Sequence, residues 1–157
     1  MRKGFTLIEL LIVIAVIAIL VGISLPRFRG MQAEGNTAKA AGELRALASA
    51  VESYYIHHSS EYPSQSMSVT SSWQSALTGA SPKIISSTLS DPFKTTQQYS
   101  YATSAGSSSE YYVIFSVGPD GAAAIEGIST AGALTGDDAP GDDIYISNGT
   151  SAMGGIN

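Results

Sequence analysis

The sequence predicts an α+β protein in which one long N-terminal helix, its first half embedded in a membrane, packs on a small antiparallel sheet. Three features of the 157-residue chain support this fold. An apolar run at residues 10–25 approaches the roughly 20 residues that cross a bilayer as a helix. Small and apolar residues then recur at helical spacing to residue 55. Two β-rich segments follow, at 99–103 and 111–117.

Composition limits the classes of function. Lys and Arg total 8 against 13 Asp and Glu, a balance that argues against a nucleic-acid partner. Zero cysteines exclude a disulfide framework and thiolate metal sites. The sequence motifs of serine hydrolases, P-loop proteins, zinc metalloproteases and dinucleotide-binding proteins are all missing, so we do not expect an enzyme.

The N-terminal segment MRKGFTLIELLIVIAVIAILVGISLP carries one carboxylate, Glu9, in its hydrophobic part. A secretory signal ends in a small-residue cleavage site, and Leu25-Pro26-Arg27-Phe28 offers none. A plain membrane anchor, oriented by Arg2 and Lys3, fits the length but leaves Glu9 unexplained. Because an ionisable group in a membrane segment is costly, Glu9 is a functional-site candidate whose partner must be found.

Residues Gly4-Phe5-Thr6-Leu7-Ile8-Glu9, with the apolar run behind them, resemble the start of type IV pilin and type II secretion pseudopilin precursors. The resemblance covers the first 26 residues, including Pro26. It implies that a prepilin peptidase cleaves between Gly4 and Phe5, that Phe5 is then N-methylated, and that Glu9 pairs with the Phe5 amine of another subunit. It also implies a pilin-like fold with four parts: a leader at 1–4, a membrane and assembly helix at 5–26, an amphipathic helix at 27–58, and a periplasmic head at 59–157.

Beyond the membrane segment we expect the helix to kink at Pro26, because proline lacks an N–H and its ring clashes with the preceding turn. Glycines weaken the stretch that follows, at Gly30, Gly35 and Gly42. The stripe expected to pack on the sheet consists of Ala41, Leu44, Ala48, Val51 and Tyr55. His57 and His58 end the helix, where they favour its dipole, and a metal site is the alternative interpretation.

Residues 59–98 are rich in Ser, Thr, Pro and Gly and predict a long irregular connection, with a short helical turn at 72–77. Trp73, in that turn, is expected to fill the core. The two β-rich segments predict a hairpin, and residues 144–147 predict a third strand.

The end of the head is acidic and contains no Lys or Arg after Lys94. It includes five aspartates: Asp120, Asp137, Asp138, Asp142 and Asp143. Hard oxygen ligands and flexible glycine turns suit Ca²⁺. The residues alone leave a solvated acidic loop and a calcium site equally open.

The sequence Gly118-Pro119-Asp120-Gly121, followed by Asp142-Asp143-Ile144, is similar to the C-terminal loop of major, G-type pseudopilins, which bind calcium there. This resemblance implies Asp120, Asp142 and Asp143 as calcium ligands, helped by backbone carbonyls of the Val117–Gly118 turn. The connection from 122 to 139 is longer than in that family, which leaves Asp137 and Asp138 as rival ligands.

The resemblance implies a structural subunit that polymerises into the periplasmic pseudopilus of a type II secretion system. The implied partners are other copies of the chain, minor pseudopilins, the prepilin peptidase and the inner-membrane assembly platform. A single span would hold the chain in the inner membrane, with its C-terminal domain in the periplasm.

Two other functions stay open. A type IV pilus subunit, used in adhesion, motility or DNA uptake, is the first alternative. The acidic loop and the zero cysteines favour the pseudopilin, because Gram-negative adhesive pilins often close their C-terminal region with a disulfide. A membrane-anchored periplasmic enzyme or binding domain is the other alternative.

Overall fold

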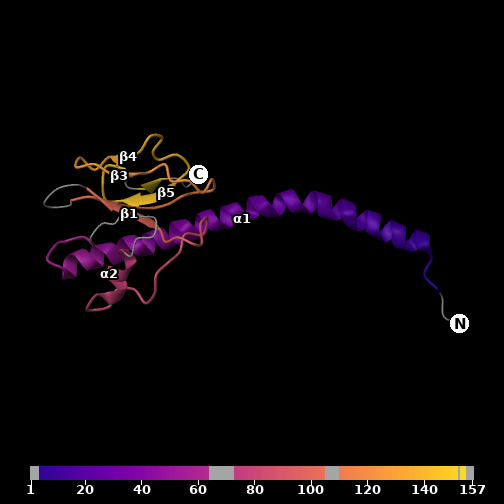
Figure 1. The fold of residues 1–157 in the computed structure, drawn as a ribbon, viewed down its shortest axis with the longest axis horizontal. Helices are drawn as coiled ribbons and strands as arrows, with labels where there is room; N and C mark the ends of the chain where they lie inside the picture. The colour runs from indigo at the N-terminus through magenta and orange to yellow at the C-terminus, as the bar shows by residue number, and fades with distance from the viewer. Residues whose placement is uncertain (1–3, 64–72, 105–109, 152, 155–157) are drawn as a thin grey trace. The chain divides into compact units, whose positions relative to one another are not determined.

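The computed structural model describes residues 4–63, 73–104, 110–151 and 153–154. It divides the chain into two compact units, residues 1–35 and 36–157. In chain order the elements are α1 (Leu7–His57), α2 (Trp73–Gly79), β1 (Ser100–Thr103), β2 (Tyr112–Ser116), β3 (Gly127–Ile128), β4 (Leu134–Thr135), β5 (Ile144–Ser147) and β6 (Met153–Gly154) (Figure 1). The predicted α+β class is confirmed.

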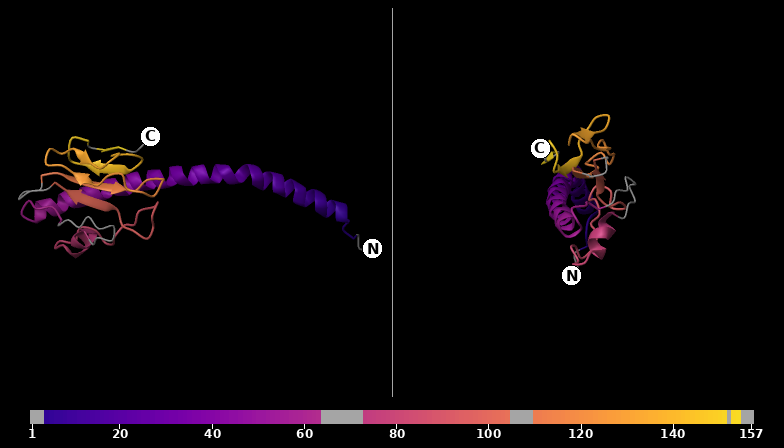
Figure 2. Two further views of the ribbon diagram at one scale, coloured as in Figure 1. Left: turned by 45° about the horizontal axis from the view of Figure 1, so that its top comes forward. Right: turned by 90° about the vertical axis from the view of Figure 1, so that its left-hand side faces the viewer.

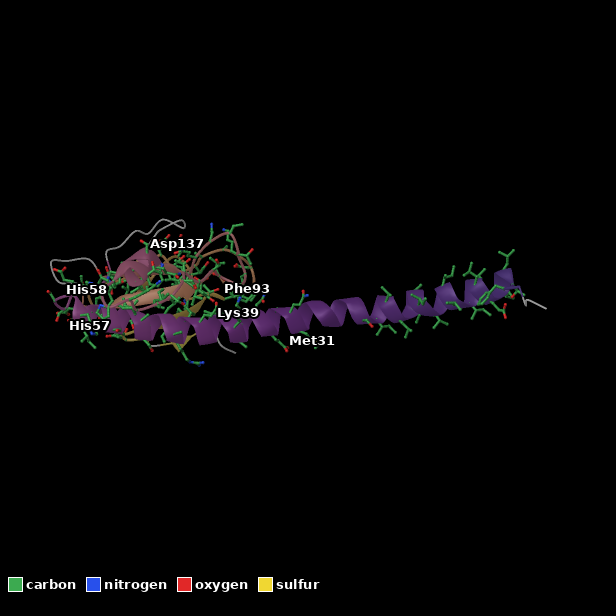
Figure 3. The ribbon with its side chains drawn as sticks, turned by 90° about the horizontal axis from the view of Figure 1, so that it is seen from below. Met31, Lys39, His57, His58, Phe93 and Asp137 are labelled. Atoms are coloured by element: carbon green, nitrogen blue, oxygen red, sulfur yellow. The ribbon has the colours of Figure 1, made fainter. Side chains whose placement is uncertain are left out.

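The first unit contains the N-terminal part of α1, which begins at a capping box. Thr6 Oγ1 accepts the N–H of Glu9 at 3.3 Å, while Glu9 Oε2 accepts the N–H and the hydroxyl of Thr6, each at 2.8 Å. The stretch Leu7–Ser24 has a mean hydropathy of 3.0 and is long and apolar enough to cross a membrane. None of it is buried, and its side chains point out on both sides of the helix in Figure 3.

The helix α1 continues without a break past Pro26 and past the three glycines that follow it. The kink at Pro26 and the weakening at the glycines therefore stay predictions. The helix ends at His57, one residue before the predicted limit.

In the second unit, α1 lies along one face of a four-stranded antiparallel sheet with the order β1-β2-β5-β6 (Figures 1 and 2). The predicted apolar stripe is confirmed, because four of its members are buried and Tyr55 is half-buried. The buried face of the helix is wider than predicted and also includes Ala40, Leu47 and Ala50. A face of this width is what a helix needs to cover a sheet.

Strand β2 is buried along its whole length because both faces of the sheet are covered. Successive side chains of a strand point to opposite faces. Accordingly, Tyr112 and Ile114 pack in the cluster with α1, whereas Val113 and Phe115 pack in a second cluster. That second cluster includes Ile125 and residues of the small sheet formed by β3 and β4.

The predicted hairpin and third strand are confirmed. Strands β1 and β2 pair antiparallel with Tyr101 opposite Ile114, and β2 pairs with β5 with Ile114 opposite Ile146. Strands β3, β4 and β6 have two residues each and were missed from the sequence, because so short a segment shows no alternation.

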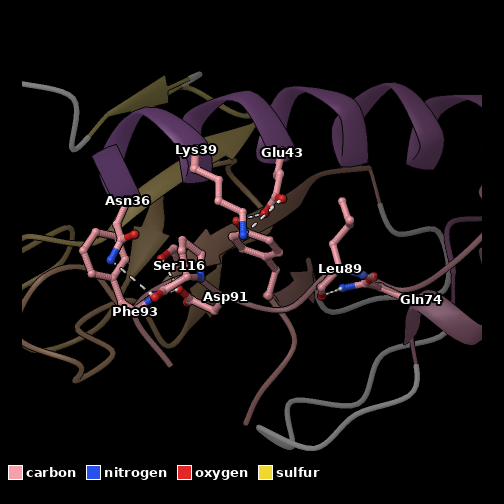
Figure 4. Close-up of polar contacts among 10 residues, drawn as sticks. Asn36, Lys39, Glu43, Gln74, Leu89, Asp91, Phe93 and Ser116 are labelled. Atoms are coloured by element: carbon pink, nitrogen blue, oxygen red, sulfur yellow. Dashed lines mark hydrogen bonds and ion pairs between the residues drawn. The ribbon is translucent and has the colours of Figure 1, made fainter. Parts of the chain in front are cut away.

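The short helix α2 carries Trp73 into the core, as predicted. Its side chain is 2% exposed, its Nε1 donates to the carbonyl of Tyr99 at 2.8 Å, and its ring stacks on Tyr101 at 4.7 Å. The Tyr99 hydroxyl in turn donates to Glu43 of α1 at 2.6 Å, which ties the helix to the start of β1 (Figure 4).

Candidate functional site

The acidic end of the head is built on a turn at residues 118–121, and a buried carboxylate, Asp91, binds the backbone just before that turn. Asp91 is 2% exposed and lies close to the end of β2 (Figure 4). Its Oδ1 accepts the Ser116 hydroxyl at 2.8 Å and the Phe93 N–H at 2.9 Å, and its Oδ2 accepts the Val117 N–H at 2.9 Å. Asp91 therefore fixes the backbone at the end of β2 through hydrogen bonds to Ser116 and Val117.

The turn itself brings Asp120 to the segment 140–143. The Gly121 N–H donates to the Gly118 carbonyl at 3.2 Å, and both glycines have positive φ, +68° at Gly118 and +74° at Gly121. Asp120 Oδ1 accepts the Ala122 N–H at 2.8 Å, and the Asp120 N–H donates to Asp142 Oδ2 at 3.1 Å. Two of the predicted calcium ligands are thus brought together.

Asp143 is the most unusual group of this region, because it is a carboxylate with 0% exposure. Its Oδ2 accepts the N–H groups of Ala124 and Ile125, at 2.9 and 2.7 Å. Its Oδ1 is buried and has no hydrogen-bond partner within the described residues. Burial raises the pKa of Asp143 to about 6, although the two N–H bonds oppose that rise; the Asp142 and Asp120 charges add to it.

The rival ligands Asp137 and Asp138 lie on the same part of the surface. An open pocket of about 450 Å³ is walled by alanines 122–124 and by five carboxylates: Asp120, Glu126, Asp137, Asp138 and Asp142. The long connection reaches this pocket because Gly136 and Gly141 pack closely on Ala124. Asp143 is the one predicted ligand that does not line it.

These residues fit a calcium ion in chemistry but form an incomplete ligand set. The unpaired Oδ1 of Asp143 is the kind of oxygen that a cation would satisfy, and all the side chains offer hard oxygen donors. Within the described parts of the chain, however, no three Asp, Glu, His or Cys side chains gather closely enough to hold a metal ion. Backbone carbonyls and water would have to supply the remaining ligands.

The predicted processing and assembly residues lie at the start of α1. Gly4, Phe5 and Thr6 precede the helix and are exposed, and Phe5 is 81% exposed. The capping role of Glu9 was not predicted, although the pattern Thr-x-x-Glu is a recognised signal for it. Both bonds from Thr6 go to Oε2, which leaves Oε1 to accept from a second donor.

The two histidines lie at the end of α1 (Figure 3), where each contacts a backbone carbonyl of the preceding turn. His57 Nδ1 lies 2.7 Å from the Ser53 carbonyl oxygen, and His58 Nδ1 lies 3.1 Å from that of Tyr54. Since a carbonyl can only accept, each Nδ1 carries the proton. This arrangement supports the helix-end interpretation.

The chain matches two protein families over successive regions. Residues 1–25 match the prokaryotic N-terminal methylation motif. Residues 27–131 match the family described as type II secretion system (T2SS), protein G. The second match includes Asp120 and stops before Asp142 and Asp143.

Curated relatives are similar over a shorter region. A fimbrial protein of Neisseria meningitidis is 41% identical over 68 residues, which are 43% of this chain and 39% of the relative. A type IV major pilin of Neisseria gonorrhoeae is 41% identical over 58 residues, 37% of this chain and 35% of the relative. A fimbrial protein of Pseudomonas aeruginosa is 46% identical over 52 residues, 33% of this chain and 34% of the relative.

The chain thus spans less than half the length of these relatives. No solved structure matches. The protein G match covers most of the chain and follows the methylation motif. It includes much of the head, in which α1 packs on the sheet. The chain therefore belongs to the type II secretion system protein G family.

Proposed function

We propose that this chain is a pseudopilin that polymerises into the periplasmic pseudopilus of a type II secretion system. The observation that carries the proposal is the protein G match over residues 27–131 behind a methylation motif at 1–25. The chain is a structural subunit rather than an enzyme. It crosses the inner membrane once, and its head lies in the periplasm. Its partners are other copies of itself, minor pseudopilins, the prepilin peptidase and the inner-membrane assembly platform.

Assembly in this proposal depends on Phe5 and Glu9. The peptidase hydrolyses the bond after Gly4 and frees the amine of Phe5 at the edge of the apolar segment. A separate transfer of a methyl group from a methyl donor then gives the N-methylated amine. Glu9 Oε1 then accepts from the Phe5 amine of a neighbouring subunit. Two opposite charges 4 Å apart attract by roughly 4 kcal/mol at an effective dielectric constant of about 20, before desolvation is counted. Because an unpaired buried charge is costly, the pair also selects the register between subunits.

Filament formation together with the assembly machinery tests this role. In cells without the wild-type chain, Glu9→Ala inserts into the membrane but forms few filaments. The matched control is Glu34→Ala, which removes an exposed carboxylate farther along α1 and leaves filament yield unchanged. A wild-type yield from Glu9→Ala would refute the assembly role of this carboxylate.

A type IV pilus subunit is the second candidate, because the curated relatives are fimbrial proteins and type IV major pilins. Deletion of the gene in its host separates the two functions. Secreted proteins accumulate in the periplasm if the chain serves secretion, whereas surface fibres disappear if it builds a pilus. Loss of fibres with intact secretion would replace the first proposal by the second.

We further propose that the acidic end of the head binds Ca²⁺ through Asp120, Asp142 and Asp143, with backbone carbonyls of the Val117–Gly118 turn. Two observations support this proposal: the unpaired Oδ1 of Asp143, and the hydrogen bond from the Asp120 N–H to Asp142 Oδ2. When bound, the ion supplies the positive charge that no Lys or Arg supplies after Lys94. The turn that carries Asp120 and the segment that carries Asp142 and Asp143 would then be held together by the cation as well as by hydrogen bonds.

Thermal melting of the full chain in detergent, with calcium, magnesium or chelator, tests this site. A ligand that binds only the folded state adds about 2.7 kcal/mol at a hundredfold excess over Kd. Calcium raises the melting temperature of the wild type, and Asp120→Ala and Asp143→Ala abolish the increase. A melting temperature that does not change with calcium would favour a solvated acidic loop. Stabilisation that survives both substitutions would move the site to Asp137 and Asp138.

A further inference from the structure

The acidic site has two halves that come from distant parts of the chain. One half is the turn at 118–121, which carries Asp120, and the other is the segment 140–143, which carries Asp142 and Asp143. The halves touch through the hydrogen bond from the Asp120 N–H to Asp142 Oδ2, at 3.1 Å. How closely they approach therefore decides whether their oxygens can share one cation.

The backbone of Asp142 passes directly over Gly118. A Cβ atom placed on Gly118 would lie 2.4 Å from the Asp142 carbonyl oxygen, 2.9 Å from its carbonyl carbon and 3.2 Å from its Cγ. Real Cβ atoms essentially never lie within 3.0 Å of such neighbours, so Asp142 and the 118–121 turn would have to separate by at least about 0.6 Å. Calcium–oxygen distances span only about 2.3–2.6 Å, so a shift of about 0.6 Å exceeds the whole width of that range.

We infer that Gly118 is a positioning residue of the calcium site, because its missing side chain lets the Asp142–Asp143 segment reach the Asp120 turn. The inference rests on the calcium binding proposed above. Alanine at this position would keep the backbone carbonyl that the proposed site uses, so the added Cβ would be the only chemical change. Gly118 acts through the position of Asp142, and the buried contacts of Asp91 with Val117 and Ser116 keep the turn from moving away to make room.

The same turn offers a matched control in Gly121. This glycine also has positive φ, +74° against +68° at Gly118, so alanine strains the backbone to a similar degree at either position. A Cβ on Gly121, however, would meet no heavy atom within 4 Å. The two alanine variants therefore differ in the displacement of Asp142 and share the backbone strain.

Calorimetric titration of the full chain in detergent with calcium chloride, after removal of metal by chelator, measures the affinity directly. Both variants are first checked for the fold by the emission of buried Trp73. We expect Gly118→Ala to weaken calcium binding at least about tenfold, as loss of an outer-shell support of a metal site typically does. The Kd of Gly121→Ala for calcium stays within about threefold of the wild-type value. Since a tenfold change in Kd corresponds to about 1.4 kcal/mol, this is a change in binding free energy of under about 0.7 kcal/mol.

Each other result overturns the inference in a recognisable way. Equal affinities for the two variants would show that the close approach at Gly118 has no effect on the ion. Loss of the fold in Gly118→Ala alone would make this glycine a residue of the fold rather than of the site. No calcium binding by the wild type would overturn the proposed calcium site itself, and with it the role of Gly118.

Discussion

Replacement of Asp91 by alanine tests how the structure holds the turn that bears the acidic site. The substitution removes the acceptor of three donors at 2.8 to 2.9 Å: the hydroxyl of Ser116 and the N–H groups of Phe93 and Val117. The hydroxyl can rotate to another acceptor, but the two N–H groups cannot. The bond from the Val117 N–H is buried and the bond from the Phe93 N–H is part-buried. A buried donor left without a partner costs about 1–3 kcal/mol.

The net effect is smaller than the sum of these costs, because the variant no longer buries a carboxylate. We therefore expect Asp91→Ala to lower the free energy of unfolding by about 2–4 kcal/mol. That is a large share of the 5–15 kcal/mol that stabilises a typical domain. Ser116→Ala, the matched control, leaves the carboxylate and both N–H bonds in place and costs about 1 kcal/mol.

Urea unfolding of the chain from Met31 onward provides the measurement, with the emission of Trp73 as the probe. This is the single tryptophan of the sequence and is 2% exposed in the fold, so its emission reports unfolding of the core. Asp91→Asn keeps the shape of the side chain but places its amide NH₂ near a donor. We expect its loss in the free energy of unfolding to lie between those of Asp91→Ala and Ser116→Ala. If Asp91→Ala lowers the free energy of unfolding no more than Ser116→Ala does, Asp91 is not the anchor of this turn.

Three further predictions concern processing, helix capping and pH. Mass spectrometry of the mature protein finds methylated Phe5 at the N-terminus, and a bulky residue in place of Gly4 leaves the precursor uncut; an intact leader on the wild type contradicts this. Thr6→Val removes the cap of α1 at a cost of about 0.5–2 kcal/mol and speeds amide exchange in the first turn, while Thr6→Ser does not; equal exchange in both variants would count against the cap. Burial raises the pKa of Tyr62 to about 12. It also raises the pKa values of Tyr99, Tyr101 and Tyr112. Because these folded-state pKa values exceed the ordinary value of 10, stability is fully present below pH 10 and falls as pH rises above it. Absorbance titration then shows these tyrosines ionising only as the chain unfolds, and ionisation with the fold intact would contradict their burial.

Local patterns in the sequence were enough to predict the larger elements. The apolar run and the helical stripe predict α1 because a helix repeats every 3.6 residues, and this repeat is visible without knowledge of the partner. Segments 99–103, 111–117 and 144–147 are rich in the residues that favour strands, and they became β1, β2 and β5. The N-terminal motif likewise lies within a few consecutive residues, so processing and assembly could be predicted from it.

The acidic site was predicted only as a set of residue types. Its arrangement depends on pairs that are far apart in the chain, such as the Asp120 N–H and Asp142 Oδ2, or Asp143 Oδ2 and the Ile125 N–H. No periodicity records such pairs, because they arise when β5 docks beside β2 in one register and brings its preceding loop to the 118–121 turn. The sequence by itself determined the family motif, the helix and the charge of the tail. Only the tertiary structure decided that Asp91 is a buried anchor, that Asp143 keeps one oxygen unpaired, and that Gly118 leaves room for Asp142.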